Sequence, residues 1–139
     1  MADVPTVIPF VRYEDAPKAI EWLKQAFGFE EQIVYPGENG TILHAELGFG
    51  NGVIMIGSAS NEASRRMSMT TARQAGGSTI GVYAHVDDVD GHFERAKAAG
   101  AEVINPPADQ EYGAREYAVK DLEGNVWSFG NYVAEAYRS

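Results

Sequence analysis

The feature that most constrains the fold of this chain is an internal repeat. Moving the sequence by 73 positions places VRYEDAPKAIE, which starts at Val11, on AHVDDVDGHFE, which starts at Ala84. The same shift places GVIMIG, from Gly52, on NVWSFG, from Asn125. Two separate blocks with one offset indicate a duplicated supersecondary unit, whose copies bury their apolar faces against each other. The sequence therefore predicts two similar modules.

Each module is predicted to fold as a strand, a helix and three further strands. Residues 7–13 and 80–86 are rich in β-branched and aromatic residues and lead into acidic residues, as strands that precede helix starts do. Apolar residues then recur at helical spacing in both copies. The remaining strand candidates are 31–35, 41–48, 53–57, 102–105, 115–120 and 126–130. The predicted class is α+β, with two tandem βαβββ modules whose curved mixed sheets surround a cleft.

The domain organisation follows from this pattern. At 139 residues the chain has the size of one domain, and we expect residues 1–139 to form it. The first module spans about 4–57 and the second about 79–132. Residues 58–78 are rich in Ser, Thr, Gly and Ala. This composition favours a mobile linker, although a lid that closes on a ligand is the alternative.

Composition excludes several function classes. Twenty acidic residues against 11 basic ones give a formal charge of −9, which disfavours nucleic acid as a partner. The longest apolar run is too short to span a bilayer, so we expect no membrane partner. The amino terminus lacks an export signal, and cysteine is absent. We therefore expect a cytoplasmic protein.

Strand alternation predicts which side chains face the cleft. In the second copy, an apolar row suited to packing on the helix comprises Ile80, Val82, Ala84 and Val86. The opposite face then carries Thr79, Gly81, Tyr83 and His85, and the equivalent residues of the first copy are Thr6, Ile8, Phe10 and Arg12. In the last strand of each module, Trp127 and Phe129 match Ile54 and Ile56 as core positions. Met55 and Ser128 therefore face the cleft.

Polar residues near these faces are candidates for chemistry. His44 and Glu46 share a strand face and could begin a metal site, and His85 could act as an acid or base. A planar guanidinium at Arg115, with the nearby phenol of Tyr112, could clamp a carboxylate or a ring. Alternatively, Arg115 pairs with an acid and orders a turn. His92 is expected to face solvent from the second helix.

Nearly the whole chain resembles one known family. The resemblance lies in the openings VIPFVRYEDAPKAIEWLKQAFGFE and VYAHVDDVDGHFERAKAAGAEV and in the closing YGAREYAVKDLEGNVWSFGNY, with its D-x-E-G-N turn before a final strand. These segments are similar to the vicinal oxygen chelate superfamily, which contains glyoxalase I, bleomycin-resistance proteins and extradiol dioxygenases. The resemblance implies that superfamily's paired βαβββ fold.

The resemblance also guides the functional prediction. The family's metal enzymes carry His, Glu or Gln ligands at positions that here hold Ile8, Met55, Gly81 and Ser128. Because these side chains are not suitable ligands, we expect no metal, no cofactor and a likeness to the metal-free bleomycin-resistance branch. That branch sequesters amphipathic organic molecules, including antibiotics, in clefts that a second subunit completes, which implies a homodimer.

The predicted ligand-binding residues are those expected to line the cleft, namely Phe10, Arg12, Met55, Tyr83, His85, Arg115 and Ser128. No catalytic residue is assigned. The alternative function is a glyoxalase-like lyase or isomerase, or a dioxygenase, with a displaced metal site that includes His44, Glu46 or His85.

Overall fold

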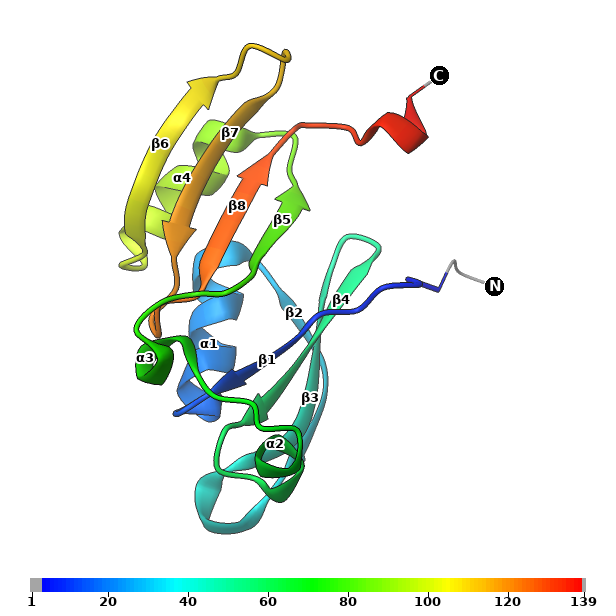
Figure 1. Ribbon diagram of the computed structural model, residues 1–139. Helices are drawn as coiled ribbons and strands as arrows, with labels where there is room; N and C mark the ends of the chain where they lie inside the picture. The colour runs from blue at the N-terminus through cyan, green and yellow to red at the C-terminus, as the bar shows by residue number, and fades with distance from the viewer. Residues whose placement is uncertain (1–3, 139) are drawn as a thin grey trace.

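The computed structural model describes residues 4–138 and contains two four-stranded sheets with helices between them (Figure 1). The strands are β1 (Phe10–Tyr13), β2 (Glu30–Pro36), β3 (Ile42–Phe49), β4 (Gly52–Ser58), β5 (Gly81–His85), β6 (Glu102–Asp109), β7 (Arg115–Lys120) and β8 (Val126–Gly130). The helices are α1 (Ala16–Phe27), α2 (Glu62–Arg66), α3 (Ala72–Ala75) and α4 (Val89–Ala98), and single 3-10 turns occur at Glu38–Gly40 and Glu135–Tyr137.

The two sheets have the same topology, which confirms the repeat. The N-terminal sheet has the strand order β1-β4-β3-β2 and the C-terminal sheet has the order β5-β8-β7-β6. In each sheet the first and fourth strands of the module run parallel, and the other pairs are antiparallel. Phe10 pairs with Met55 and Tyr83 with Ser128, so both partners move by the same 73 positions. The fold class predicted from the sequence is therefore confirmed.

Helix α1 has clear signals at both ends. The Asp15 side chain caps it by accepting a hydrogen bond from the Lys18 backbone N–H at 3.2 Å, and Pro17 lies in the first turn, where its missing N–H does no harm. The helix ends at Gly28, whose φ of 85° lies in the left-handed region that favours glycine. These local signals fix the helix that covers the N-terminal sheet.

Aromatic side chains fill the space between the helices and the sheets. Trp127 and Phe129 are fully buried, as predicted, and their ring centroids lie 5.3 and 4.7 Å from that of Phe27 on α1. The Trp22 indole N–H donates to the Ala99 carbonyl at 2.8 Å, which joins α1 to the end of α4. The two modules therefore share one core.

The turn between β7 and β8 adds a polar connection between the modules. The buried carboxylate of Asp121 accepts hydrogen bonds from the Tyr13 hydroxyl at 2.6 Å and the Trp127 indole N–H at 2.9 Å. The buried carboxylate of Glu123 accepts from the backbone N–H groups of Glu14 and Asp15 at 2.7 and 2.9 Å. This turn of the second module thus holds the β1–α1 junction of the first.

The prediction that His92 faces solvent is wrong. Its Nε2–H donates to the Phe27 carbonyl at 2.8 Å, and its Nδ1 accepts from the Tyr117 hydroxyl at 2.6 Å. Burial lowers the pKa of His92. The reason is tertiary, because α4 packs on α1 and turns this side of the helix toward the core.

One other expectation needs correction. Ile80 does not pack on the helix but is 76% exposed, since β5 begins only at Gly81 and no strand pairing holds Ile80 in place. The segment 58–78 contains two short helices, α2 and α3, which are capped by Asn61 and Thr71. Across residues 4–138, no helix is long and apolar enough to cross a membrane.

Candidate functional site

Each sheet has one face that packs on a helix and one that does not, which we call its open face. On the N-terminal sheet, the buried Ile54 and Ile56 face the helix, so the alternating Met55 lies on the open face. Phe10 and Arg12 lie on that face beside Met55 and Gly57 respectively. Three of the predicted ligand-binding residues therefore share one surface.

Arg12 is the most unusual residue of the N-terminal open face. Only 9% of it is exposed, and its Nε has no hydrogen-bond partner among residues 4–138. Its Cζ lies 5.6 Å from the centroid of the Phe10 ring. Gly57 leaves room for the guanidinium, which a side chain at that position would hit. Burial lowers the pKa of Arg12, and an unmet buried donor is unfavourable unless a partner arrives.

His44 and Glu46 also lie on the N-terminal open face and contact each other. The distance between His44 Nε2 and Glu46 Oε2 is 2.8 Å. Tyr35 stacks on the His44 ring at a centroid distance of 6.3 Å. Within residues 4–138, no group of three or more His, Cys, Asp or Glu side chains is placed to hold a metal ion. His44 and Glu46 therefore form a hydrogen-bonded pair that could supply two ligands to a metal ion, without a third in the described part of the chain.

The C-terminal open face carries Tyr83, His85 and Ser128. Tyr83 pairs with Ser128, and His85 with Gly130, between β5 and β8. On β7, Glu116 lies opposite Gly130 and has the same orientation, because the alternating Tyr117 is buried against the helix. A side chain at Gly130 would collide with the Tyr83 hydroxyl and with Glu116. Glycine at this position thus allows the phenol and the carboxylate to approach each other.

Arg115 does not join the other candidates. Its guanidinium contacts Asp90 of α4 at 2.9 Å and Asp109 of β6 at 3.1 Å. Hydrogen bonds to these carboxylates raise the pKa of Arg115. The arginine lies on the helix side of the sheet and orders the end of β7. The structure therefore matches the alternative in which Arg115 pairs with nearby acids.

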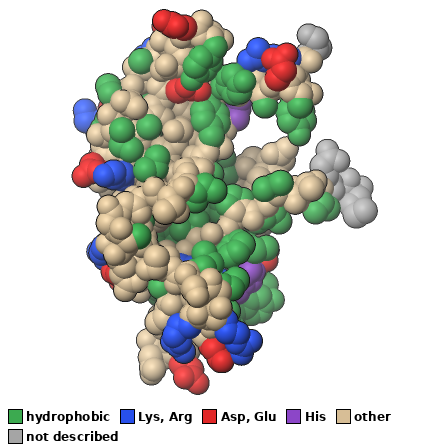
Figure 2. All heavy atoms as spheres, in the orientation of Figure 1, with side chains coloured by type: hydrophobic (Ala, Val, Ile, Leu, Met, Phe, Trp, Pro, Cys, Tyr) green, Lys and Arg blue, Asp and Glu red, His purple; other side chains and the backbone are tan. Residues whose placement is uncertain are grey.

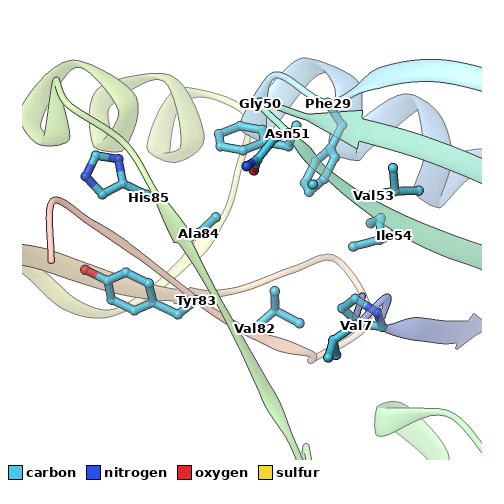
Figure 3. A pocket seen from close by; sticks show the side chains of 13 residues that line it. Val7, Phe29, Gly50, Asn51, Val53, Ile54, Val82, Tyr83, Ala84 and His85 are labelled. Carbon is cyan, nitrogen blue, oxygen red and sulfur yellow. The ribbon is translucent and has the colours of Figure 1, made fainter. Parts of the chain in front are cut away.

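The space between the two modules is a mostly apolar cavity of about 370 Å³ (Figure 3). Val82 and Ala84 of β5 point toward it from one side, Val53 and Ile54 of β4 line the other, and Phe29 also lines it. Tyr83 and His85 also line it, although their side chains point to the opposite side of β5 in Figure 3. The other five predicted residues are not among those that line this cavity.

Two further hollows contain Phe10, Arg12 and Ser128. Phe10 and Arg12 line a small one of about 140 Å³ with Thr71 of the segment between the modules. A larger hollow of about 750 Å³ lies on the C-terminal open face beneath the last residues of the chain. We call it the C-terminal hollow, and its lining includes Tyr83, Tyr112, Glu116, Ser128, Tyr132 and Arg138.

The sequence interpretation missed three of these lining residues, namely Glu116, Tyr132 and Arg138. Glu116 alternates with the buried Tyr117 and Val119, so the strand pattern already contained the signal for its orientation. Tyr132 lies beyond β8 in an irregular segment, where no periodicity indicates orientation. Its backbone N–H donates to the Tyr83 hydroxyl at 3.1 Å, and this hydrogen bond brings it to the hollow.

The residues at the four positions where the family's metal enzymes hold ligands do not fit a metal ion. Ile8 and Gly81 have no coordinating side-chain atom. Met55 and Ser128 offer a thioether and a hydroxyl, which are poor ligands for hard or borderline divalent ions. Met55 lies on the N-terminal open face and Ser128 on the C-terminal open face.

Comparison with known families agrees with the topology. Residues 6–129 match the family model described as Glyoxalase/Bleomycin resistance protein/Dioxygenase superfamily. The chain belongs to this superfamily.

Relatives of this glyoxalase-superfamily chain are similar over nearly its full length. It is 34% identical over 131 residues to the uncharacterized protein Mb0911c of Mycobacterium bovis, a match that covers 94% of this chain and 86% of the relative. TioX from Micromonospora sp. ML1 is 33% identical, with a TM-score of 0.73, and the match covers 93% of this chain and 99% of TioX. A glyoxalase-related enzyme from Fulvimarina pelagi has a TM-score of 0.71 at 16% identity, covering 92% of this chain and 88% of the other, and shows the fold alone.

Proposed function

We propose that this protein is a metal-independent small-molecule-binding protein, similar to the antibiotic-binding resistance proteins of its superfamily, which sequesters an amphipathic organic ligand. The observation that carries the proposal is Arg12, a buried guanidinium whose Nε lacks an acceptor among residues 4–138. Beside it the Phe10 ring is 46% exposed. A ligand with an apolar body and an acceptor group would cover the ring and satisfy the guanidinium.

The metal-dependent alternative has less support. A displaced site would begin with His44 and Glu46, which contact each other. His85 lies on the other sheet and contacts Asp87 instead, at 3.9 Å. A lyase, isomerase or dioxygenase that used this pair would need further ligands from outside the described residues.

We further propose that the protein acts in the cytoplasm as a homodimer. The N-terminal open face exposes Phe10, Ile33 and Tyr35, by 46%, 36% and 51%. A second copy that covered this face would remove these apolar side chains from water. Sedimentation at several protein concentrations tests the assembly, and a monomer at all concentrations contradicts it.

Thermal-shift titration tests the binding function, since a ligand that binds only the folded state raises Tm. The panel contains anionic, neutral and cationic amphipathic molecules and divalent metal ions, with and without a chelator. We expect stabilisation by an organic ligand that persists in the chelator. Arg12→Met should weaken this binding, whereas the control Arg66→Met should not, because Arg66 is an exposed residue of α2 paired with Glu62.

Elemental analysis of the purified protein provides the opposing result. Stoichiometric metal that is lost in both His44→Ala and Glu46→Gln would contradict metal independence and favour the enzyme. Metal independence would also be contradicted if no organic ligand in the panel changed Tm and only metal ions stabilised the protein.

A further inference from the structure

The C-terminal hollow has a ligand chemistry of its own, which differs from that around Arg12. Three tyrosines meet there. The ring centroids of Tyr83 and Tyr132 are 6.4 Å apart and those of Tyr112 and Tyr132 are 5.6 Å apart, both in edge-to-face arrangements. Tyr83 and Tyr112 are 42% and 57% exposed. Figure 2 shows an indentation beneath the C-terminal segment on the right of the molecule, with hydrophobic side chains beside it.

Glu116 gives this aromatic hollow a negative charge. Its carboxylate accepts a hydrogen bond from the Tyr112 hydroxyl. Among residues 4–138, no lysine, arginine or histidine side chain lies within ion-pair distance of it. A half-buried carboxylate that is surrounded by phenols and lacks a cation is suited to a positively charged guest.

The two phenols nearest Glu116 remain neutral. Burial raises the pKa of Tyr83, and the hydrogen bond to Glu116 raises the pKa of Tyr112. Both hydroxyls therefore keep their protons, and neither becomes a second negative charge beside Glu116. The electron-rich ring faces and the carboxylate are the groups that can interact favourably with a cation.

Arg138 shows that this aromatic surface accepts a cation. Its Cζ lies 5.1 Å from the centroid of the Tyr132 ring. The charge of Arg138 is itself compensated, since Nη1 lies 3.3 Å from Glu135 and Nε donates to the Val133 carbonyl. Arg138 is therefore an example, within the protein, of a cation on one of these rings, and it does not neutralise the charge of Glu116.

We propose that the C-terminal hollow binds an organic cation, in which an ammonium or guanidinium group is attached to an aromatic or aliphatic body. Tyr112 and Tyr132 contact the cationic group through their ring faces, and Glu116 provides the opposite charge. Tyr83 and Ser128 border the space for the body of the ligand. This inference rests on the proposed function, which is small-molecule binding on the open faces, and it names the class of ligand that the C-terminal open face would bind.

A pair of fluorescent probes tests the charge preference directly. N-methylacridinium is a permanent cation, and acridine is a neutral molecule of nearly the same shape at mildly alkaline pH. We expect the protein to bind the cation at least about tenfold more tightly than the neutral probe, from the added ion–carboxylate and cation–π contacts. Fluorescence titration at two salt concentrations measures both affinities, and salt should weaken only the cation.

Two variants assign the preference to this hollow. Glu116→Gln should weaken the cation by about tenfold while leaving the neutral probe unchanged. Tyr132→Leu keeps an apolar side chain but removes the ring, and it should weaken the cation by about threefold to fivefold. Glu94→Gln is the matched control, because Glu94 is an exposed residue of α4 and the substitution removes the same charge. Its affinities should equal those of the wild type.

Three results would overturn the inference. They are equal affinities for the two probes, equal effects of Glu116→Gln and Glu94→Gln, and failure of the wild type to bind either probe. The binding function itself is judged separately by the ligand panel and by Arg12→Met, which lies on the other sheet. If the wild type shows no preference for the cation while a folded Glu116→Gln protein still responds to an Arg12-dependent ligand, this inference alone is contradicted.

Discussion

The polar connection at Asp121 gives a stability prediction whose magnitude follows from the hydrogen bonds. In Asp121→Asn, one carboxylate oxygen becomes an amide N–H₂ group. Oδ2 now accepts from both the Tyr13 hydroxyl and the Trp127 indole, and Oδ1 accepts from the backbone N–H groups of Glu123 and Asn125. With Oδ1 kept as the amide oxygen, the amide nitrogen faces the two side-chain donors.

The tyrosine hydroxyl can rotate and accept, but the indole N–H cannot. A buried donor left without a partner costs about 1–3 kcal/mol, and the lost charge-assisted bond to Tyr13 adds about 1 kcal/mol, so we expect a loss of about 3 kcal/mol. With an unfolding entropy of about 2.1 cal/mol/K per residue, 139 residues give a fall in Tm of about 10 °C.

Calorimetry or circular dichroism during heating measures this change. Asp87→Asn is the matched control, because its side chain is 99% exposed and the expected change is below about 0.5 kcal/mol. Tyr13→Phe should lose less than Asp121→Asn, since the indole N–H keeps its acceptor. If Asp121→Asn melts within about 2 °C of Asp87→Asn, the hydrogen bonds of this turn do not hold the modules as argued.

Three other substitutions probe the packing. Burial lowers the pKa of His92 below its ordinary value of 6.5, so its neutral form stabilises the fold fully above that pH and less as the pH falls below it. Urea unfolding at several pH values should show this loss in the wild type, and the free energy of unfolding of His92→Gln should depend less on pH. Gly28→Ala should lower the free energy of unfolding by about 1–2 kcal/mol in urea, from the left-handed backbone and a collision with Arg95. Arg115→Met should leave ligand affinity unchanged in titrations, because Asp90 holds Arg115 on the helix side; a loss of binding would return Arg115 to the site.

The repeat made most of the fold predictable. Because one offset related two blocks, it implied equal strand registers, and the Phe10–Met55 and Tyr83–Ser128 pairs have this relation. Alternation along β8 also placed the buried Trp127 correctly. Both inferences used only the period of a strand and the 73-residue offset, which can be recognised in the sequence without knowing how the elements pack.

Contacts between elements were not predictable in the same way. The burial of His92 depends on how α4 lies on α1, and the periodicity of one helix contains no information about its neighbour. Arg115 reads as a ligand clamp in sequence because Asp90, its partner, is 25 positions away on a helix. Strand alternation could have placed Glu116, whereas Tyr132 follows the last strand and required the structure.

The β7–β8 turn has a counterpart in the first module, and the two copies have diverged in what they do. The offset of 73 relates Asp121 to Gly48 and Glu123 to Gly50, so the first copy has no carboxylates with which to grip the opposite helix start. Its β3–β4 turn instead borders the inter-module cavity through Gly50 and Asn51. Of these two equivalent turns, only the β7–β8 turn therefore connects the modules by carboxylate hydrogen bonds. Substitutions in the β3–β4 turn can change the wall of the cavity without removing those hydrogen bonds.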